Sequence, residues 1–304
     1  MSFSGLCNQG VTLVFGQLTF TGIKDLTFQA YSRRKTFRTL FRLYQTRPYS
    51  NQELILVFDR GQQVEASTNS YGGFYTKTLT DLAGAILQKV QLPGGEEVKL
   101  MNDMYDTQIR KFDSSVIVVS DIDDTLIHSF IYKKIRKFRT LMFTTMEKRK
   151  AVMTMQQLIQ DFTNGGATPI YLSNSEQNLY PMIYRFLDHN KFPRGPLFLK
   201  QMRSLWDLIW NIKFPLLNIH KTNTLEELMK FFPEKKFVLM GDNTQHDLTI
   251  YLAVAEKYPE NIRYIIIRKV VERHADTALI EKAAKWKKPV RVYYSDSFPA
   301  KFEL

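Results

Sequence analysis

The sequence predicts an α/β fold, a parallel sheet with helices on both faces, preceded by an N-terminal β-sandwich-like domain. In the C-terminal two thirds, long segments of helical period separate four short apolar runs, at 116–119, 169–172, 237–240 and 264–267. Buried strands that alternate with helices are typical of a parallel sheet covered on both faces. Before this part, residues 11 to about 80 form short alternating runs broken by polar residues or glycine, as antiparallel strands do.

The N-terminal part contains recognisable strands and one turn. Residues 11–15 and 53–58 are rich in β-branched, aromatic and leucine side chains, which favour strands. The stretch 68–75 predicts a tight turn between two strands, in which Gly72 or Gly73 supplies a positive φ. We therefore expect a compact all-β region here, and it contains no cluster of titratable side chains.

A turn at 92–95, Leu-Pro-Gly-Gly, marks the approach to a domain boundary. We expect a β-rich accessory domain at 1–110 and an α/β domain at 111–304. A chain of 304 residues is long enough to bury a core in each of them.

Two helices of the α/β part are clear from their apolar periodicity. Apolar side chains recur at helical spacing over 179–187 and again over 225–232. The second helix is predicted to begin at a capping box formed by Thr224 and Glu227.

The composition is that of an ordered globular protein, with 44% hydrophobic and 24% charged residues. The single cysteine, Cys7, excludes an internal disulfide and a thiolate metal cluster, and it suits a reducing compartment. The sequence shows neither the basic and apolar segments of a signal peptide nor an apolar run of membrane-spanning length. We therefore expect a cytoplasmic protein without a transmembrane segment.

The net charge of +12 favours phosphate-bearing partners, and its distribution is uneven. Residues 128–150 contain eight Lys or Arg and one Glu, which gives this segment +7 of the total. We expect an anionic small molecule or lipid as the partner rather than a nucleic acid.

Three acidic residues follow the first apolar run directly, at Asp121, Asp123 and Asp124. They are predicted to lie at the carboxyl edge of the sheet, where open α/β sheets bind ligands. Crowded carboxylates repel one another unless a cation neutralises them, and oxygen ligands suit Mg²⁺. Asp121 and Asp123 are two residues apart, so both can face one site, where one can attack and the other can move a proton.

A second acidic pair follows the third apolar run. Gly241 is predicted to let the chain turn sharply, so that Asp242 emerges at the same edge of the sheet, with Asp247 five residues later. Two strand ends that each deliver a carboxylate make a plausible metal site.

Between the two acidic segments lie groups suited to an anion. Ser173 and Asn174 follow the second apolar run and precede a helix, whose free amide groups and dipole favour phosphate. Lys221 precedes the third apolar run and can supply a cation to the same phosphate.

These four motifs, in this order, resemble those of the haloacid dehalogenase superfamily. The strings are SDIDDT at 120–125, YLSNSE at 171–176, HK at 220–221 and GDNTQHD at 241–247. They are most similar to the phosphatidate phosphatases of fungi and bacteria that are related to the yeast actin-patch protein. The resemblance covers roughly residues 115 to 275, with family-atypical residues at Glu176, Thr244, Leu248 and 200–203.

The resemblance implies a haloacid-dehalogenase-like fold and a Mg²⁺-dependent phosphatase that forms an aspartyl-phosphate. Asp121 would be the nucleophile, and Asp123 would protonate the leaving group and then deprotonate the attacking water. Mg²⁺ would be held by Asp121, Asp123 through its carbonyl, Asp242 and Asp247. The phosphate-binding residues would be Ser173, Asn174 and Lys221, and the supporting residues Thr125 and Gly241.

The basic segment lies where this superfamily inserts a cap, which we expect as a helical insert at about 128–152. Its charges at 133–150 interleave with apolar residues, so a helix there would have an apolar stripe beside a cationic face. We hypothesise that this face makes peripheral contact with anionic lipid headgroups or with an acidic partner. The alternative is an ordinary solvated face.

Three functions stay open at this point. The first is hydrolysis of phosphatidate to diacylglycerol and phosphate. The second is hydrolysis of a soluble metabolite phosphate or a phosphoprotein, and the third is a non-catalytic binding protein that retains the fold. Structural alternatives exist as well, since Ser173 and Asp247 can be helix caps and Lys221 a solvated lysine.

Overall fold

The structure is a computed structural model that describes residues 1–20, 42–43, 45–98, 100, 106–128, 150–200, 217–272, 274–286, 290–299 and 302. The chain divides into two compact units. The β-rich unit comprises Met1–Asp113, Ser175–Phe186 and Leu199–Lys213, and the α/β unit comprises Ser114–Asn174, Leu187–Phe198 and Phe214–Leu304. Whether the chain folds as two independent domains that meet at residue 110 stays a prediction.

The β-rich unit contains two four-stranded sheets. One has the order β5-β2-β1-β8 and the other the order β4-β3-β6-β7. Their strands are β1 (Ser2–Asn8), β2 (Val11–Gln17), β3 (Glu53–Phe58), β4 (Gln63–Ser67), β5 (Gly73–Thr78), β6 (Leu87–Gln91), β7 (Glu97–Val98) and β8 (Ile109–Lys111). Neighbouring strands pair antiparallel, except β1 and β8, which pair parallel.

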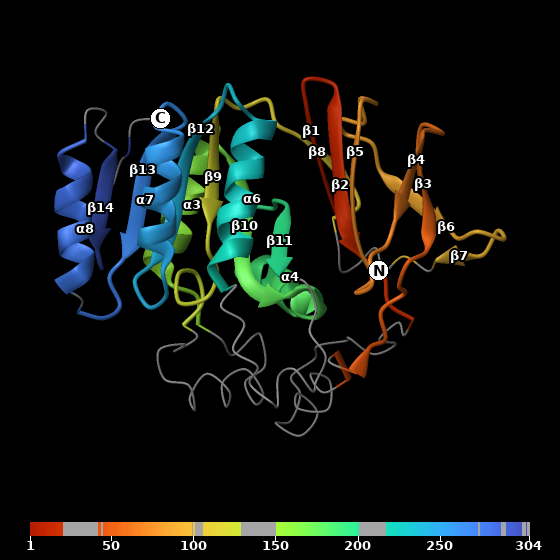
Figure 1. Cartoon of the computed structure of the whole chain (residues 1–304), viewed down its shortest axis with the longest axis horizontal. Helices are drawn as coiled ribbons and strands as arrows, with labels where there is room; N and C mark the ends of the chain where they lie inside the picture. The colour runs from red at the N-terminus through yellow and green to blue at the C-terminus, as the bar shows by residue number, and fades with distance from the viewer. Residues whose placement is uncertain are drawn as a thin grey trace. The chain divides into compact units, whose positions relative to one another are not determined.

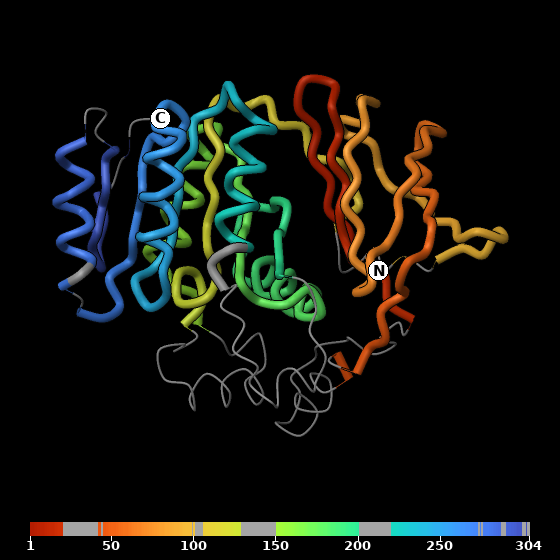
Figure 2. Tube along the Cα trace, viewed as in Figure 1, coloured from red at the N-terminus to blue at the C-terminus, as the bar shows by residue number. Residues whose placement is uncertain are grey.

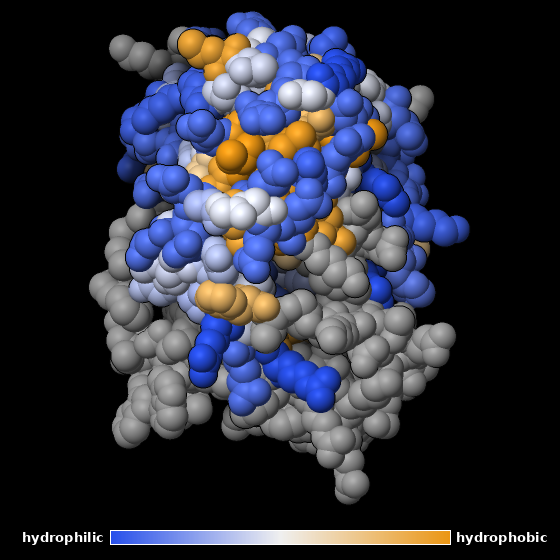
Figure 3. All heavy atoms as spheres, turned by 90° about the vertical axis from the view of Figure 1, so that its right-hand side faces the viewer, coloured by the Kyte–Doolittle hydropathy of each residue, from blue (hydrophilic) through white to orange (hydrophobic). Residues whose placement is uncertain are grey.

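Both sheets contribute side chains to one apolar cluster in this unit. Phe3 from β1, Phe74 from β5 and Phe58 from β3 are all buried in it. On the outer face seen from the side of β3 and β4, most residues are hydrophilic, and some apolar residues form a patch among them (Figure 3). The apolar residues of the short alternating runs therefore face an interior, as their pattern predicts.

The predicted turn at 68–75 is present, and Gly72 has the positive φ, 72°. A Cβ atom at Gly72 would lie 2.3 Å from the carbonyl oxygen of Leu18, so the close approach also requires glycine. The turn does not close a hairpin within one sheet, because β4 and β5 belong to different sheets. It carries the chain from one sheet to the other.

The α/β unit is built on a six-stranded parallel sheet with the order β11-β10-β9-β12-β13-β14. The strands are β9 (Val116–Ser120), β10 (Thr168–Glu176), β11 (Leu197–Lys200), β12 (Lys236–Asp242), β13 (Ile262–Arg268) and β14 (Arg291–Ser295). All four apolar runs are strands, which confirms the predicted α/β class. From β9 the chain steps outward to β10 and β11, then returns to β12 on the other side of β9 (Figure 2).

Helices lie between these strands in the sequence. They are α3 (Met153–Asn164), the 3-10 turn η2 (Gln177–Leu179), α4 (Tyr180–His189), α6 (Leu217–Phe231), α7 (Asp247–Lys257) and α8 (His274–Ala284). Of these, η2 and most of α4 belong to the β-rich unit. Helices α6 and α7 lie over one face of the sheet and α3 over the other (Figure 1). The predicted helices at both faces are therefore present.

The predicted capping box is wrong. Helix α6 already includes Leu217, so Thr224 and Glu227 lie inside it. Lys221 and Leu225 are one turn apart and are both fully buried, so the buried face of the helix extends N-terminal to the apolar pattern. The buried position one turn earlier is a lysine, which an apolar periodicity does not detect.

The basic segment 133–150 and most of the predicted cap insert lie outside the described residues. The two ends of this connection lie side by side, since the amide of His128 donates to the carbonyl of Lys150 at 3.2 Å and Ile127 bridges to Ala151. The segment thus leaves and re-enters the fold at one place, just after β9. In the described part of the chain, no helix has the length and apolarity needed to cross a membrane.

Candidate active site

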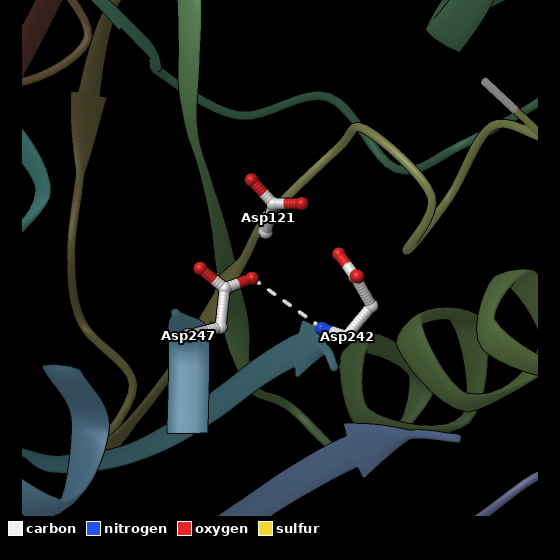
Figure 4. Close-up of side chains that lie close together, drawn as sticks. All are labelled: Asp121, Asp242 and Asp247. Atoms are coloured by element: carbon white, nitrogen blue, oxygen red, sulfur yellow. Dashed lines mark hydrogen bonds between the residues drawn. The ribbon is translucent and has the colours of Figure 1, made fainter. Parts of the chain in front are cut away.

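Three carboxylates converge at the carboxyl edge of the parallel sheet. Asp121 follows β9, Asp242 ends β12 and Asp247 begins α7. One oxygen of each lies within 4.8 Å of the others, and all three residues are at most 1% exposed (Figure 4). Strands β9 and β12 are neighbours, and the amide of Asp121 donates to the carbonyl of Met240 at 2.8 Å. This pairing brings the two strand ends, and with them the acids, together.

Lys221 on α6 is the cation of this cluster. Its Nζ donates to Asp121 Oδ1 at 2.6 Å and to Asp247 Oδ1 at 2.5 Å, and its side chain is fully buried. Among the described side chains, this group of three carboxylates is paired with one lysine, so it would carry two negative charges in excess if all three were ionised. In a buried site such an excess is unfavourable unless protons or a further cation neutralise it.

Neutral donors hold the remaining carboxylate oxygens in place. The hydroxyl of Thr125 lies 3.1 Å from Asp121 Oδ2 and 3.2 Å from Asp242 Oδ2, so it links the two strand ends. The amide of Thr244 donates to Asp242 Oδ1 at 2.5 Å, and the amide of Asp242 donates to Asp247 Oδ2 at 3.3 Å (Figure 4). Each acid is therefore oriented by at least one donor.

Burial and mutual repulsion shift the pKa values of these groups. Burial raises the pKa of Asp121 well above its usual range, Lys221 opposes this shift, and the neighbouring carboxylates add to it. Burial, with the charge of Asp247, raises the pKa of Asp242 to about 7. Burial lowers the pKa of Lys221, but Asp121 and Asp247 outweigh burial and leave it raised. Lys221 therefore stays charged, whereas Asp121 and Asp242 hold a proton at higher pH than an ordinary aspartate does.

The donor set fits a hard divalent cation. Carboxylate oxygens, without imidazole or thiolate among the clustered side chains, are the ligands that Mg²⁺ and similar metals prefer. A cation would also take the place of the protons that the raised pKa values of Asp121 and Asp242 favour. The cluster is therefore compatible with a metal site formed by Asp121, Asp242 and Asp247.

Asp123 faces a different neighbour. Its side chain does not belong to the cluster of close oxygens, and its Oδ2 accepts a hydrogen bond from the hydroxyl of Ser173 at 3.2 Å. Ser173 is fully buried inside β10, so the strand next to β9 delivers this hydroxyl to the site. The Nδ2 atom of Asn174 donates to Gln245 Oε1 at 3.4 Å, beside the second acidic segment. The structure thus brings Ser173 to Asp123, and it brings Lys221 to Asp121 and Asp247.

The expected sharp turn at Gly241 is wrong. Gly241 lies inside β12, and it is not among the residues with a positive φ. Its lack of a side chain serves close packing instead, because a Cβ atom there would lie 2.7 Å from Asp247 Cβ and 2.9 Å from Tyr251 Cε2. Glycine at this position lets the start of α7, which carries Asp247, approach the strand.

Two residues that contribute to the architecture of this edge were not predicted from the sequence. Arg268 ends β13 and donates from Nη1 to the carbonyl of Asp124 at 2.6 Å. Asn243 is buried and holds the segment after β13 through hydrogen bonds from the amides of Val270 and Val271. The available signal was weak: a basic residue closing an apolar strand run, and an amide residue beside an acid.

Comparison with known proteins agrees with the motifs. The sequence model of a family described as "Phosphatidate phosphatase APP1, catalytic domain" matches residues 116–269. The chain is similar to "Phosphatidate phosphatase APP1" of Saccharomyces cerevisiae, with 28% identity over 206 residues, 66% of this chain and 34% of the yeast protein. It is also similar to "Uncharacterized protein C29B5.04c" of Schizosaccharomyces pombe, with 25% identity over 236 residues, 76% of this chain and 38% of that protein. The matches span little more than a third of the length of these relatives.

The pairing of Lys221 with two buried acids predicts a large loss of stability when it is removed. Lys221→Met is expected to lower the free energy of unfolding of the metal-free protein by about 3–5 kcal/mol, as for buried ion pairs that lose one partner. Asp121→Asn should cost much less, because it removes one of the repelling charges and leaves Lys221 paired with Asp247. Urea unfolding in the presence of a chelator measures both. Lys230→Met, on the exposed face of the same helix, is the control, and a Lys221→Met protein as stable as the control would contradict this pairing.

The raised pKa of Asp242 predicts a pH-dependent effect of divalent cations. Between its ordinary pKa of 3.8 and about 7, the folded protein keeps a proton that the unfolded chain has lost. The stability of the metal-free protein therefore falls as the pH rises through this window and levels off above it. A cation binds the deprotonated acid, so millimolar Mg²⁺ should raise the melting temperature more above pH 7 than below it. An equal Mg²⁺ effect on both sides of pH 7, or the same pH dependence in Asp242→Asn, would show that this acid is not involved.

Proposed function

Since the family model covers half of it, this chain belongs to the APP1-type phosphatidate phosphatase family, and from this we propose that it hydrolyses phosphatidate to diacylglycerol and phosphate. We propose further that the reaction depends on Mg²⁺ and passes through an aspartyl-phosphate on Asp121. The observation that carries the proposal is the buried cluster of Asp121, Asp242 and Asp247 inside the matched region. The cluster supplies a nucleophile and a cation site at one edge of a haloacid-dehalogenase-like sheet.

Asp121, Asp242 and Asp247 would hold Mg²⁺, with the carbonyl of Asp123 as a further ligand. When bound, the cation neutralises the negative charge that the site and the transferring phosphoryl group share. The close packing of three carboxylates around one lysine supports this assignment. Without a cation, a phosphate dianion would be repelled from these carboxylates.

Asp121 carries out the first displacement. One of its carboxylate oxygens forms a bond to phosphorus, and the bond from phosphorus to the glycerol oxygen breaks. Asp123 gives its proton to that leaving oxygen, which releases diacylglycerol. In the second step Asp123 takes a proton from water, the water oxygen bonds to phosphorus, and the bond to Asp121 breaks. Phosphate leaves, and both acids return to their starting state.

The other predicted residues would bind the phosphoryl oxygens and orient the acids. Ser173 and Asn174 lie beside Asp123 and Gln245, which supports a place for them next to the transferring group. Lys221 holds Asp121 in a fixed orientation and lowers the cost of bringing a phosphate near it. Thr125 fixes the second oxygen of Asp121.

The lipid nature of the substrate rests on family membership and on the net charge of the chain. The basic segment 133–150 is proposed to make peripheral contact with anionic lipid, in a cytoplasmic protein. A phosphatase for soluble phosphomonoesters would need the same residues at the reacting phosphorus, so a direct comparison of substrates distinguishes the two.

Replacing Asp121 or Asp123 in the first motif should lower phosphate release by different amounts. Asp123→Asn removes the proton donor and is expected to lower the rate by about 10²–10⁴-fold. Asp121→Asn removes the nucleophile and should leave no measurable turnover. Phosphate release from phosphatidate, with Mg²⁺ and with a chelator, measures both variants, and Asp106→Asn in the β-rich unit is the control. Turnover that is independent of Mg²⁺, or unchanged in Asp121→Asn, would contradict this mechanism.

A substrate panel separates a lipid phosphatase from a general phosphomonoesterase. The proposal predicts a higher kcat/KM for phosphatidate in mixed micelles than for p-nitrophenyl phosphate or small sugar phosphates. A preference for soluble substrates would retain the phosphatase mechanism and reject phosphatidate as the substrate. Activity on none of them would support the non-catalytic alternative.

A further inference from the structure

The turn that follows Asp123 is held in an unusual conformation. Asp124 has a φ of 57°, in the left-handed region that non-glycine residues rarely adopt, and it is only 2% exposed. The turn then closes on itself, because the amides of Leu126 and Ile127 both donate to the carbonyl of Ile122, at 2.8 and 3.1 Å. The direction in which Asp123 points therefore depends on this backbone turn, in which the next residue, Asp124, has the left-handed conformation.

Arg268 fixes this turn from the neighbouring part of the sheet. Its Nη1 donates to the carbonyl oxygen of Asp124 at 2.6 Å, a short bond from a charged donor. Arg268 forms no ion pair with a carboxylate of the described residues, although Asp124, Asp242 and Asp296 are near enough to act on it electrostatically. The contact that the guanidinium makes is thus with the backbone of the first acidic motif.

The same residue also meets the second acidic motif. Arg268 lies opposite Asp242 in the register of β13 and β12, and its carbonyl oxygen accepts a hydrogen bond from the amide of Asn243 at 3.2 Å. Arg268 thereby connects both acidic loops, the first through its side chain and the second through its backbone.

A buried polar network fixes the strand end that carries Arg268. The Oδ1 atom of Asn243 accepts from the amides of Val270 and Val271, at 2.8 and 3.1 Å. Its Nδ2 donates to the hydroxyl oxygen of Tyr294 at 2.6 Å, and that hydroxyl donates to Asp276 Oδ2 at 2.9 Å. Strand β14 and helix α8 are thus tied to the segment directly after Arg268.

We infer that Arg268 is a positioning residue for Asp123: by holding the Asp124 carbonyl it aims the Asp123 carboxyl group at the leaving oxygen. The inference rests on the proposed function, because it assigns to Asp123 the proton transfer described above. It adds a residue outside the four motifs, on a strand that the mechanism does not otherwise use.

If Arg268 orients Asp123 toward the leaving oxygen, its loss should affect substrates differently according to their leaving group. A purely structural role of Arg268 would affect all substrates alike. A glycerol oxygen is a poor leaving group and needs the proton from Asp123, whereas p-nitrophenolate leaves without it. Misorientation of Asp123 should therefore slow the first step with phosphatidate but not the first step with p-nitrophenyl phosphate. The second step uses Asp123 as the base for both substrates, so the first turnover must be measured separately.

The experiment compares Arg268→Met and Arg268→Lys with wild type, with Asp123→Asn as the reference. Arg263→Met, the same change at the other end of β13, is the control. Turnover of phosphatidate is expected to fall about 10- to 100-fold in Arg268→Met, as for a misplaced catalytic group. The first-turnover burst of p-nitrophenol should persist in this variant and in Asp123→Asn. Arg268→Lys, which keeps the charge and one donor, should lose less than Arg268→Met.

Three outcomes would overturn the inference. Equal losses of first-turnover rate with both substrates and a raised KM would mean that Arg268 binds the phosphate itself. Unchanged turnover of phosphatidate in a folded Arg268→Met protein, as judged by its melting curve, would show that the turn does not need the guanidinium. If Arg268→Met fails to fold, the same comparison in Arg268→Lys decides, and an unselective loss there rejects the inference. A wild type inactive on every phosphomonoester would instead reject the proposed function, and this inference with it.

Discussion

The site depends on one physical constraint: three carboxylates are buried within 4.8 Å of one another, beside a single lysine. Like charges at this distance and burial are strongly unfavourable, so the arrangement persists only because other groups stabilise it. Lys221 contributes one charge, and the hydroxyl of Thr125 contributes a hydrogen-bond donor between Asp121 and Asp242. Protons or a divalent cation can neutralise the remaining negative charge, so the cluster is compatible with a metal site.

The order of the strands places these acids together. Strand β9 is central, and the chain moves from it to β10 on one side before returning to β12 on the other. The carboxyl ends of all three strands then meet at one edge, which is the general place for ligands in open α/β sheets. This is why Asp121, Ser173 and Asp242, far apart in sequence, could be assigned to one site before any coordinates. The apolar runs identified the strands, and the polar residue at each strand end identified the edge.

What the sequence could not supply was the choice of partner for each side chain. Lys221 was expected to face phosphate, and the structure pairs it with Asp121 and Asp247, since nothing in a local pattern distinguishes a buried lysine from a solvated one. Gly241 was expected to turn the chain, yet it makes room for α7, a reason that depends on a helix packed in three dimensions. Arg268 was missed because its bond to the Asp124 carbonyl joins residues 144 positions apart. Predictions succeeded where the pattern repeats locally and failed where a single tertiary contact decides.

The proposed metal site requires that Asp121 and Asp242, two of the three clustered aspartates, both contact one divalent cation. A crystal structure of the protein soaked in Mn²⁺, with anomalous diffraction recorded for the metal, tests it most directly. A single strong anomalous peak is expected about 2–2.4 Å from oxygens of Asp121 and Asp242, at the carboxyl end of β9 and β12. A protein that binds no Mn²⁺, or binds it only away from these two residues while Lys221 still contacts Asp121, would rule out this metal site.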